Sequence, residues 1–316
     1  MAARGASTPT LIFKPKRSKS DAFERNWGLL FVAPWLIGLF AFSIGPMLYS
    51  LYLSFTNFNL INGEAAQFVG LKNWISIFTD PVILKAFLVT LKYILIVVPF
   101  LLIAPLFLAL FLNSKNVWAK GFFLTMFFVP QLIPQVVTGL IWQGTLNSRG
   151  PINASLEKLG IPGPAWLQDA NWVMPAIAIV GLWGIGNSIL QMIAAMKNVP
   201  TELYEAATID GANPLVCFFK ITLPLMSSVL FYSVVTGIIY GFQYFTITFL
   251  IYRGQSGPDD AALFFMLLLF KESFVYYNMG KASALAWVMF IFCITITQLL
   301  FATSKRWVYY AGEVRK

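Results

Sequence analysis

Apolar residues gather into six long runs along the chain, separated by short polar stretches. The runs cover residues 28–54, 86–112, 121–143, 173–195, 223–250 and 279–303. Each is long enough to cross a hydrocarbon core of roughly 30 Å as an α-helix. All 13 Asp and Glu residues lie outside these runs. The pattern predicts an all-α integral membrane protein with about six transmembrane helices in one bundle.

The polar ends of the chain give the expected organisation. We predict a basic tail at 1–26, a membrane domain at 27–304 and a short tail at 305–316. The first apolar run is longer than a signal peptide core, and no small-residue cleavage site follows it, which indicates an uncleaved anchor. Fourteen of the 22 basic residues lie in the two tails or in the loops that six crossings place on the same side of the membrane as the tails. Because Lys and Arg collect in cytoplasmic segments, both termini are expected in the cytoplasm.

Composition narrows the classes of protein. Hydrophobic residues make up 58% of the chain and charged residues only 11%, with a mean hydropathy of +0.73. A water-soluble domain carries roughly 25% charged residues. The net charge of +9 comes from scattered or terminal residues, so we expect no nucleic-acid partner. His is absent, and Cys217 and Cys293 lie in apolar surroundings without metal-ligand spacing.

One loop, at 197–222, has the pattern of a helix–turn–helix. Pro200 suits a first helical turn, and Gly211 suits the left-handed residue that ends a helix. Pro214 suits the start of a second helix, and Pro224 opens the fifth apolar run. We expect one face of the second helix to hold Leu215, Phe218, Phe219 and Thr222. By this physical pattern alone, the loop remains compatible with an ordinary surface helix pair.

The residues of this loop resemble the EAA signature of ABC importer permeases. Glu-Ala-Ala is followed after three residues by Gly, and after nine more by Ile-x-Leu-Pro. In that family the element is a coupling helix that sits in a groove of the cytoplasmic ATPase. The resemblance assigns ATPase coupling to seven positions, namely Glu205, Ala206, Ala207, Gly211, Ile221, Leu223 and Pro224.

The resemblance extends over most of the chain and is to the maltose-type and glycerol-3-phosphate-type permeases. It is carried by Phe68–Trp74, Pro130, Trp142, Gly150–Asn153 and Trp183. It implies a type I importer permease bundle in the bacterial inner membrane, which forms half of a pathway for a sugar or oligosaccharide. One stretch departs from the family, because Tyr252–Pro258 replaces the usual Thr-x-Gly-Gly-Pro string.

The resemblance also implies partners. These are a second homologous permease subunit, two copies of an ABC ATPase and an extracytoplasmic sugar-binding protein, together with the lipid bilayer that surrounds the permease subunits. A homodimer remains an alternative to the heterologous pair. The chain has no phosphate-binding G-x-x-x-x-G-K-[ST] loop. We therefore expect a non-catalytic subunit without a cofactor of its own, with ATP and Mg bound by the ATPase.

Polar residues inside the runs are the candidates for a substrate path. Sugars need hydrogen-bond partners together with apolar ring faces, and amides and tyrosines supply both. Family resemblance puts the fourth and fifth runs along the path and favours Asn187, Gln243, Tyr244 and Tyr240. Hydrogen bonding between helices is the alternative for each of them. Gly237 and Gly241 form a G-x-x-x-G pair, which we interpret as helix packing.

Other functions remain alternatives. A secondary transporter usually needs an ionisable residue deep in a span, and the candidate here, Lys92, lies near the end of the second run. A membrane-embedded enzyme would need a nucleophile or metal cluster. A structural scaffold leaves the EAA string unexplained.

Overall fold

The computed structural model describes residues 19–61, 65–114 and 117–309. The two predicted tails lie partly outside this range, at 1–18 and 310–316. Within the described residues all regular structure is helical, and the sole β pairing is an isolated bridge between Thr56 and Phe68. The prediction of an all-α membrane protein is confirmed. Among the described residues, four helical spans are long and apolar enough to cross a membrane, and two bent helix pairs raise the number to six.

The chain divides into two units, Met1–Tyr52 and Leu53–Lys316. The first unit holds α1 (Lys19–Leu39), a π-helical turn at Phe40–Ile44 and most of α2 (Gly45–Ser54). Helix α1 begins inside the tail predicted at 1–26. Residues 19–26 contain neither Pro nor Gly, so extension of the helix into them is inexpensive.

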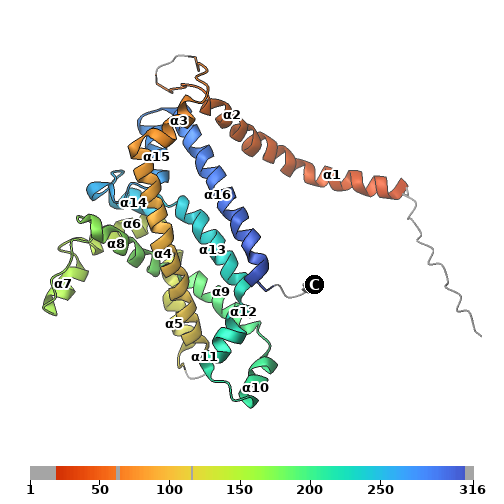
Figure 1. The fold of residues 1–316 in the computed structure, drawn as a ribbon, viewed down its shortest axis with the longest axis vertical. Helices are drawn as coiled ribbons and strands as arrows, with labels where there is room; N and C mark the ends of the chain where they lie inside the picture. The colour runs from red at the N-terminus through yellow and green to blue at the C-terminus, as the bar shows by residue number, and fades with distance from the viewer. Residues whose placement is uncertain (1–18, 62–64, 115–116, 310–316) are drawn as a thin grey trace, which may run out of the picture. The chain divides into compact units, whose positions relative to one another are not determined.

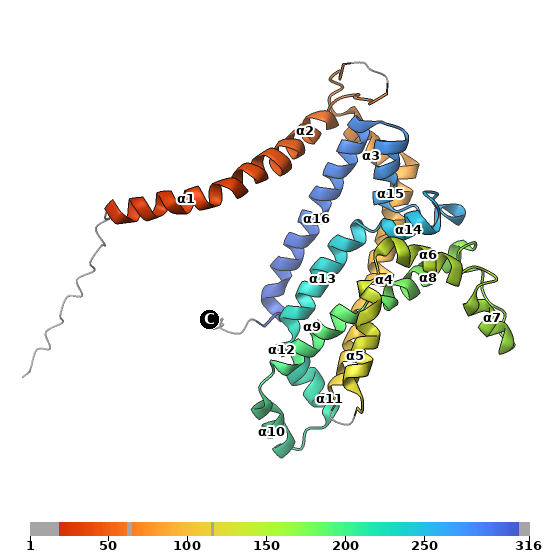
Figure 2. The ribbon, with the colours of Figure 1, turned by 180° about the vertical axis from the view of Figure 1, so that it is seen from behind.

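The second unit is built around α4 (Pro81–Asn113), against which α8, α9, α13 and α15 pack. Its other long helices are α13 (Ser227–Phe242) and α16 (Met279–Trp307). Figures 1 and 2 show α10 and α11 at one end of this unit, with α3 (Lys72–Thr79) and α15 (Phe265–Phe270) at the other. A short helix, α7 (Pro151–Lys158), lies between the third and fourth spans.

The glycine pair on α13 packs against α4 as predicted. A Cβ on Gly237 would lie 2.9 Å from Val98 Cγ1, and one on Gly241 would lie 2.6 Å from Ile94 Cγ1. Both distances are shorter than carbon atoms tolerate. The absence of side chains at these two positions therefore allows α13 and α4 to approach closely.

The third and fourth spans are broken, which the apolar pattern does not reveal. Helices α5 (Lys120–Phe128) and α6 (Gln135–Thr145) are joined through a 3₁₀ turn at Val129–Leu132 and bend by 103°. Helices α8 (Ala170–Trp183) and α9 (Gly186–Lys197) bend by 61°. Hydropathy continues across both breaks, so the sequence predicts single runs.

The two broken spans cross at Gly186. A Cβ there would collide with the backbone carbonyl of Phe127. At the same crossing the backbone N–H of Asn187 donates to Gln131 Oε1 at 2.8 Å. A glycine and one polar contact therefore fix the crossing of the third and fourth spans.

The apolar stretch Leu263–Phe270 contains a short helix between the fifth and sixth spans. Helix α15 begins at Phe265 and continues into a π-helical turn at Lys271–Val275. Phe265, Leu267 and Leu268 are buried, and the helix packs on α4 and α16.

Candidate functional site

The predicted helix–turn–helix is present, and its turn has a defined helix cap. Helix α10 spans Thr201–Ile209, with Pro200 just before its first residue. Gly211 adopts φ +76°. The Ala212 N–H donates to Ala207 O at 2.8 Å, and the Gly211 N–H donates to Thr208 O at 3.1 Å. These two bonds form a Schellman cap, in which glycine takes the left-handed position without steric conflict.

The second half of the loop runs continuously toward the fifth span. It consists of α11 (Pro214–Cys217), a π-helical turn at Phe218–Thr222 and α12 (Leu223–Leu225). Asn213 Oδ1 caps α11 by accepting from the Val216 N–H at 2.9 Å. The extra residue of a π turn shifts the helical register. Thr222 is therefore buried while Leu215 and Phe219 are exposed, so the common face expected for these residues is wrong.

One side-chain contact joins the two halves of the loop. The Tyr204 hydroxyl lies 2.7 Å from Thr222 Oγ1. Tyr204 belongs to α10, and Thr222 stands in the continuous helical stretch that leads to α13. This hydrogen bond therefore links α10 to the base of the fifth span, in addition to the backbone connection.

The seven positions assigned to ATPase coupling divide into two groups. Glu205, Ala206 and Gly211 are exposed on α10 and its cap, and Ala207 is half-buried. The other three stand in the helical stretch that leads to α13, where Ile221 and Leu223 are half-buried and Pro224 is exposed.

Large apolar side chains are exposed beside the first group. Ile209 is 87% exposed, Leu215 68% and Phe219 61%. These three residues stand on α10 and the stretch that follows it, at one end of the helical unit (Figure 1). The loop therefore presents a mixed acidic and apolar surface.

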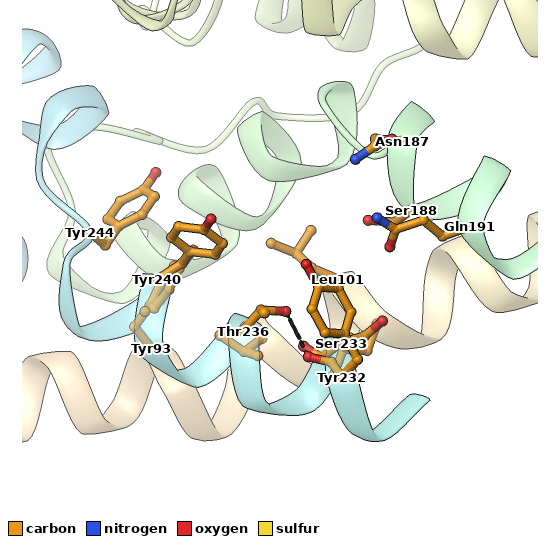
Figure 3. Close-up of a pocket in the computed structure, with 14 residues that line it drawn as sticks. Tyr93, Leu101, Asn187, Ser188, Gln191, Tyr232, Ser233, Thr236, Tyr240 and Tyr244 are labelled. Carbon is orange, nitrogen blue, oxygen red and sulfur yellow. Dashed lines mark hydrogen bonds between the residues drawn. The ribbon is translucent and has the colours of Figure 1, made fainter. Parts of the chain in front are cut away.

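A cavity of about 310 Å³, which we call the central cavity, lies between α4, α9 and α13. Figure 3 shows that Asn187, Ser188 and Gln191 face it from one side and the polar residues of α13 from the other. Three predicted path residues, Asn187, Tyr240 and Tyr244, line this cavity together. Gln243 does not line it; this residue is exposed at the C-terminal cap of α13.

Stacked aromatic rings close one end of the cavity. The rings of Tyr93 and Tyr244 stack with centroids 4.6 Å apart, and Phe264 packs against both at 5.5 and 5.1 Å. The cavity thus combines hydroxyl and amide groups with apolar ring faces, which is the chemistry that binds sugars.

Sequence reasoning missed four polar residues that α4 and α13 contribute to this cavity, namely Tyr93, Tyr232, Ser233 and Thr236. Three residues of α13, Tyr232, Thr236 and Tyr240, recur at helical spacing of four and share a face. That period would have identified the two residues missed among them. Tyr93 is the lone tyrosine of α4 and has no such pattern around it.

The end of the unit opposite the α10 loop holds a partly buried ionic cluster. Lys281 Nζ lies 2.9 Å from Glu272 Oε1 and 3.1 Å from Asp80 Oδ2. The Asn278 amide donates to Glu272 Oε2 at 3.1 Å. Burial favours the neutral form of Asp80, but hydrogen bonds from Lys281 and the Val82 N–H outweigh it and lower the pKa of the carboxyl group.

A second ion pair nearby is more exposed. Lys85 Nζ lies 2.9 Å from Asp260 Oδ2, and roughly half of each side chain is open to solvent. The Ser256 hydroxyl and then the Lys85 ammonium hold the pKa of Asp260 below its usual value. Earlier in the same loop, burial raises the pKa of Tyr252 to about 12, so its hydroxyl stays neutral.

Comparison with known proteins agrees with this architecture. Residues 73–309 match the family "Binding-protein-dependent transport system inner membrane component". The probable ABC transporter permease protein YesP of Bacillus subtilis (strain 168) is 37% identical over 94% of this chain and 96% of its own. The arabinooligosaccharides transport system permease protein AraP of the same organism is 32% identical, with 85% of each chain covered.

A solved structure shows the same fold. A chain of a bacterial alginate ABC transporter, in complex with alginate pentasaccharide-bound periplasmic protein, superposes with a TM-score of 0.79 at 21% identity. The match covers 91% of this chain and 97% of that one. This multi-pass chain therefore belongs to the family of inner membrane components of binding-protein-dependent transport systems, the permease subunits of ABC importers.

Proposed function

We propose that the chain is one permease subunit of an ATP-driven ABC importer for a sugar or oligosaccharide, and that it forms half of the translocation pathway. The observation that carries this proposal is the capped α10 loop. It places the EAA residues on a surface of exposed acidic and apolar side chains and is linked to the span that lines the central cavity. The name of AraP supports a saccharide as the substrate class.

The proposed mechanism is alternating access. A binding protein delivers the sugar to the bundle, and ATP with Mg closes two ABC ATPase subunits below it. Glu205 contacts the ATPase groove, and Gly211 provides the turn that holds α10 in place. A coupling of this kind requires contacts that differ in free energy between the two states. The Tyr204–Thr222 hydrogen bond lies on the path between α10 and α13.

The central cavity is the proposed substrate path. Asn187, Tyr240 and Tyr244 contact the sugar as it passes, with Tyr93 and Tyr244 offering ring faces. A second homologous permease subunit forms the other half of the pathway. In this arrangement both termini and the α10 loop are cytoplasmic, and ATP hydrolysis belongs to the partner ATPase.

The test is a mild-detergent pull-down of the tagged chain from native membranes, with partners identified by mass spectrometry. We expect a second polytopic subunit and a protein with a phosphate-binding loop. Glu205→Ala should release the latter. Glu202→Ala is the matched control, because Glu202 is also exposed on α10 but lies outside the EAA string.

Two results would contradict the proposal. One is a chain that purifies alone and moves sugar in liposomes without ATP, as a secondary transporter does. The other is equal loss of the ATPase in the Glu205 and Glu202 variants. That result would mean that the negative charge of α10 as a whole, and not Glu205 in particular, holds the ATPase.

A further inference from the structure

Helix α14 (Thr246–Ile251) ends in a cap that ordinarily uses glycine, but an arginine occupies the position. The Gly254 N–H donates to Phe249 O at 2.7 Å, and the Arg253 N–H donates to Leu250 O at 3.2 Å. This is the same bond pattern that follows α10. Arg253 has φ +52°, in the left-handed region.

Two other helices of the chain have this cap with glycine in place. The cap that follows α7 has Gly160 with φ +72°, and the cap that follows α10 has Gly211 with φ +76°. The Cβ of an L-residue is disfavoured in this conformation. Residues held there despite the strain concentrate at functional sites. The side chain of Arg253 is therefore the feature to explain.

Arg253 lines a polar cavity of about 530 Å³, formed by the end of α6, the segment before α8 and the end of α14. The end of α6 closes the third span, the end of α14 closes the fifth span, and the segment before α8 leads into the fourth span. The α10 loop follows the fourth span. By the count of spans, the cavity and the α10 loop lie on opposite sides of the membrane. The polar and aromatic side chains of its wall are Gln143, Asn147, Gln168, Tyr252 and Arg253.

The amides of this cavity are oriented by hydrogen bonds to neighbouring groups. Gln143 Nε2 donates to Ile251 O at 2.6 Å. Asn147 Oδ1 accepts from the Arg149 N–H at 3.0 Å, and Gln168 Oε1 accepts from the Ser148 hydroxyl at 3.1 Å. Asn147 and Gln168 thus use their oxygens internally, which leaves their NH₂ groups for a ligand.

The guanidinium of Arg253 adds five N–H donors and a permanent positive charge. No ion pair to Arg253 occurs among the described residues. Asp260 of the same loop is already held by Lys85 and Ser256. The cavity is therefore rich in donors and carries one positive charge.

We propose that this cavity is a second saccharide subsite of the chain and that it takes a sugar bearing a carboxylate, such as a uronic acid. Arg253 binds the carboxylate through two parallel hydrogen bonds. The amides of Asn147 and Gln168 donate to hydroxyl groups, and the Tyr252 ring covers an apolar sugar face. This inference rests on the proposed function, since the sugar meets this cavity before it reaches the central one.

The test uses the whole transporter complex in lipid nanodiscs without the binding protein, so that selectivity comes from the membrane subunits. Calorimetry compares digalacturonate with neutral galactobiose. We expect digalacturonate to bind about tenfold more tightly. Arg253→Gly should weaken digalacturonate binding about tenfold and leave galactobiose binding unchanged. Arg253→Lys should lie between Arg253→Gly and the wild-type chain, because the charge remains but the two-pronged geometry is lost.

Arg149→Gln is the matched control, because by the count of spans it removes the same charge from the same side of the membrane but outside the cavity wall. Its binding of digalacturonate should match the wild-type chain. The melting temperature of Arg253→Gly should be unchanged or higher, since glycine suits φ +52°. This result would show that the variant is folded and that weaker binding comes from the missing guanidinium.

Equal affinity for the two probes, or equal losses in Arg149→Gln and Arg253→Gly, would overturn the subsite. ATPase activity stimulated by the binding protein in the same nanodiscs reports separately on the proposed function. Stimulation without preference for digalacturonate would count against the acidic-sugar subsite alone. Absence of stimulation would count against the importer itself.

Discussion

The caps that end α10 and α14 have the same pair of backbone hydrogen bonds but different residues in the left-handed position. After α10 the residue is Gly211, where a Cβ would have no heavy atom within 4 Å, so backbone conformation alone explains the glycine. After α14 the residue is Arg253, whose side chain lines a cavity. At the first cap the residue is a glycine, which the left-handed backbone conformation favours. At the second cap the sequence departs from that preference, and such departures mark candidate binding sites.

The largest effect is expected from Gly211→Pro. Proline fixes φ near −65° and has no N–H, so it permits neither φ +76° nor the bond to Thr208 O. We predict that the chain still inserts in the membrane and that sugar uptake falls at least about 100-fold, because α10 loses its position. Membrane fractionation measures insertion, and labelled sugar measures uptake.

Gly160→Pro is the control for this prediction. Gly160 has φ +72° in the same type of cap, on α7, away from the α10 loop. It should reduce uptake much less than Gly211→Pro. Normal uptake by Gly211→Pro would disprove the coupling role of this turn.

The next effect concerns the buried and exposed ion pairs. Lys281→Met leaves the Glu272 carboxylate, 7% exposed, without its cation. We predict a loss of about 3 kcal/mol in unfolding free energy, because an unpaired charge remains buried. Lys85→Met removes a pair that is nearly half exposed and should cost less than about 1 kcal/mol. Denaturant unfolding in detergent compares the unfolding free energies of the two variants. Similar losses would contradict the claim that burial makes the Lys281 pair the more important one.

A smaller effect is expected from Tyr204→Phe. The variant keeps the ring and removes the hydroxyl that lies 2.7 Å from Thr222 Oγ1. We predict a loss of about 1 kcal/mol in stability and a lower ratio of sugar imported to ATP hydrolysed, with the ATPase still bound. An unchanged ratio would place the coupling entirely in the backbone of the loop.

The smallest effects compare the two caps directly. Gly211→Ala should lower the unfolding free energy by about 1 kcal/mol, because alanine must adopt φ +76°. Arg253→Gly should raise it by about 0.5 kcal/mol, because the relief of backbone strain exceeds the added entropy of the unfolded chain. Thermal unfolding measures both, and changes of the same sign would contradict the comparison.

Local patterns predict the α10 loop well because its structure depends on neighbours in sequence. Gly211 and Pro214 have their structural roles as expected from local rules. The position of Thr222 is not predicted, since a π turn leaves no sequence signal of its own. Whether the seven EAA positions contact an ATPase stays a prediction.

Contacts between distant segments explain what the pattern could not predict. The third and fourth spans bend, and Gly186 and Gln131 meet at their crossing only in the folded chain. The central cavity unites Asn187, Tyr240 and Tyr244 as the polar pattern suggested. It also includes Tyr93, which α4 brings from more than 90 residues away. Arg253 is in the stretch that departs from the family, and only its backbone angle shows that the position is strained.

Sugar uptake by proteoliposomes tests the central claim most directly. The liposomes contain the purified chain with its co-purifying subunits, and the binding protein is added outside. The account predicts uptake that requires both enclosed ATP and the binding protein, and that is lost in Gly211→Pro. Uptake by the chain without ATP, driven by an ion gradient and unaffected by Gly211→Pro, would contradict it.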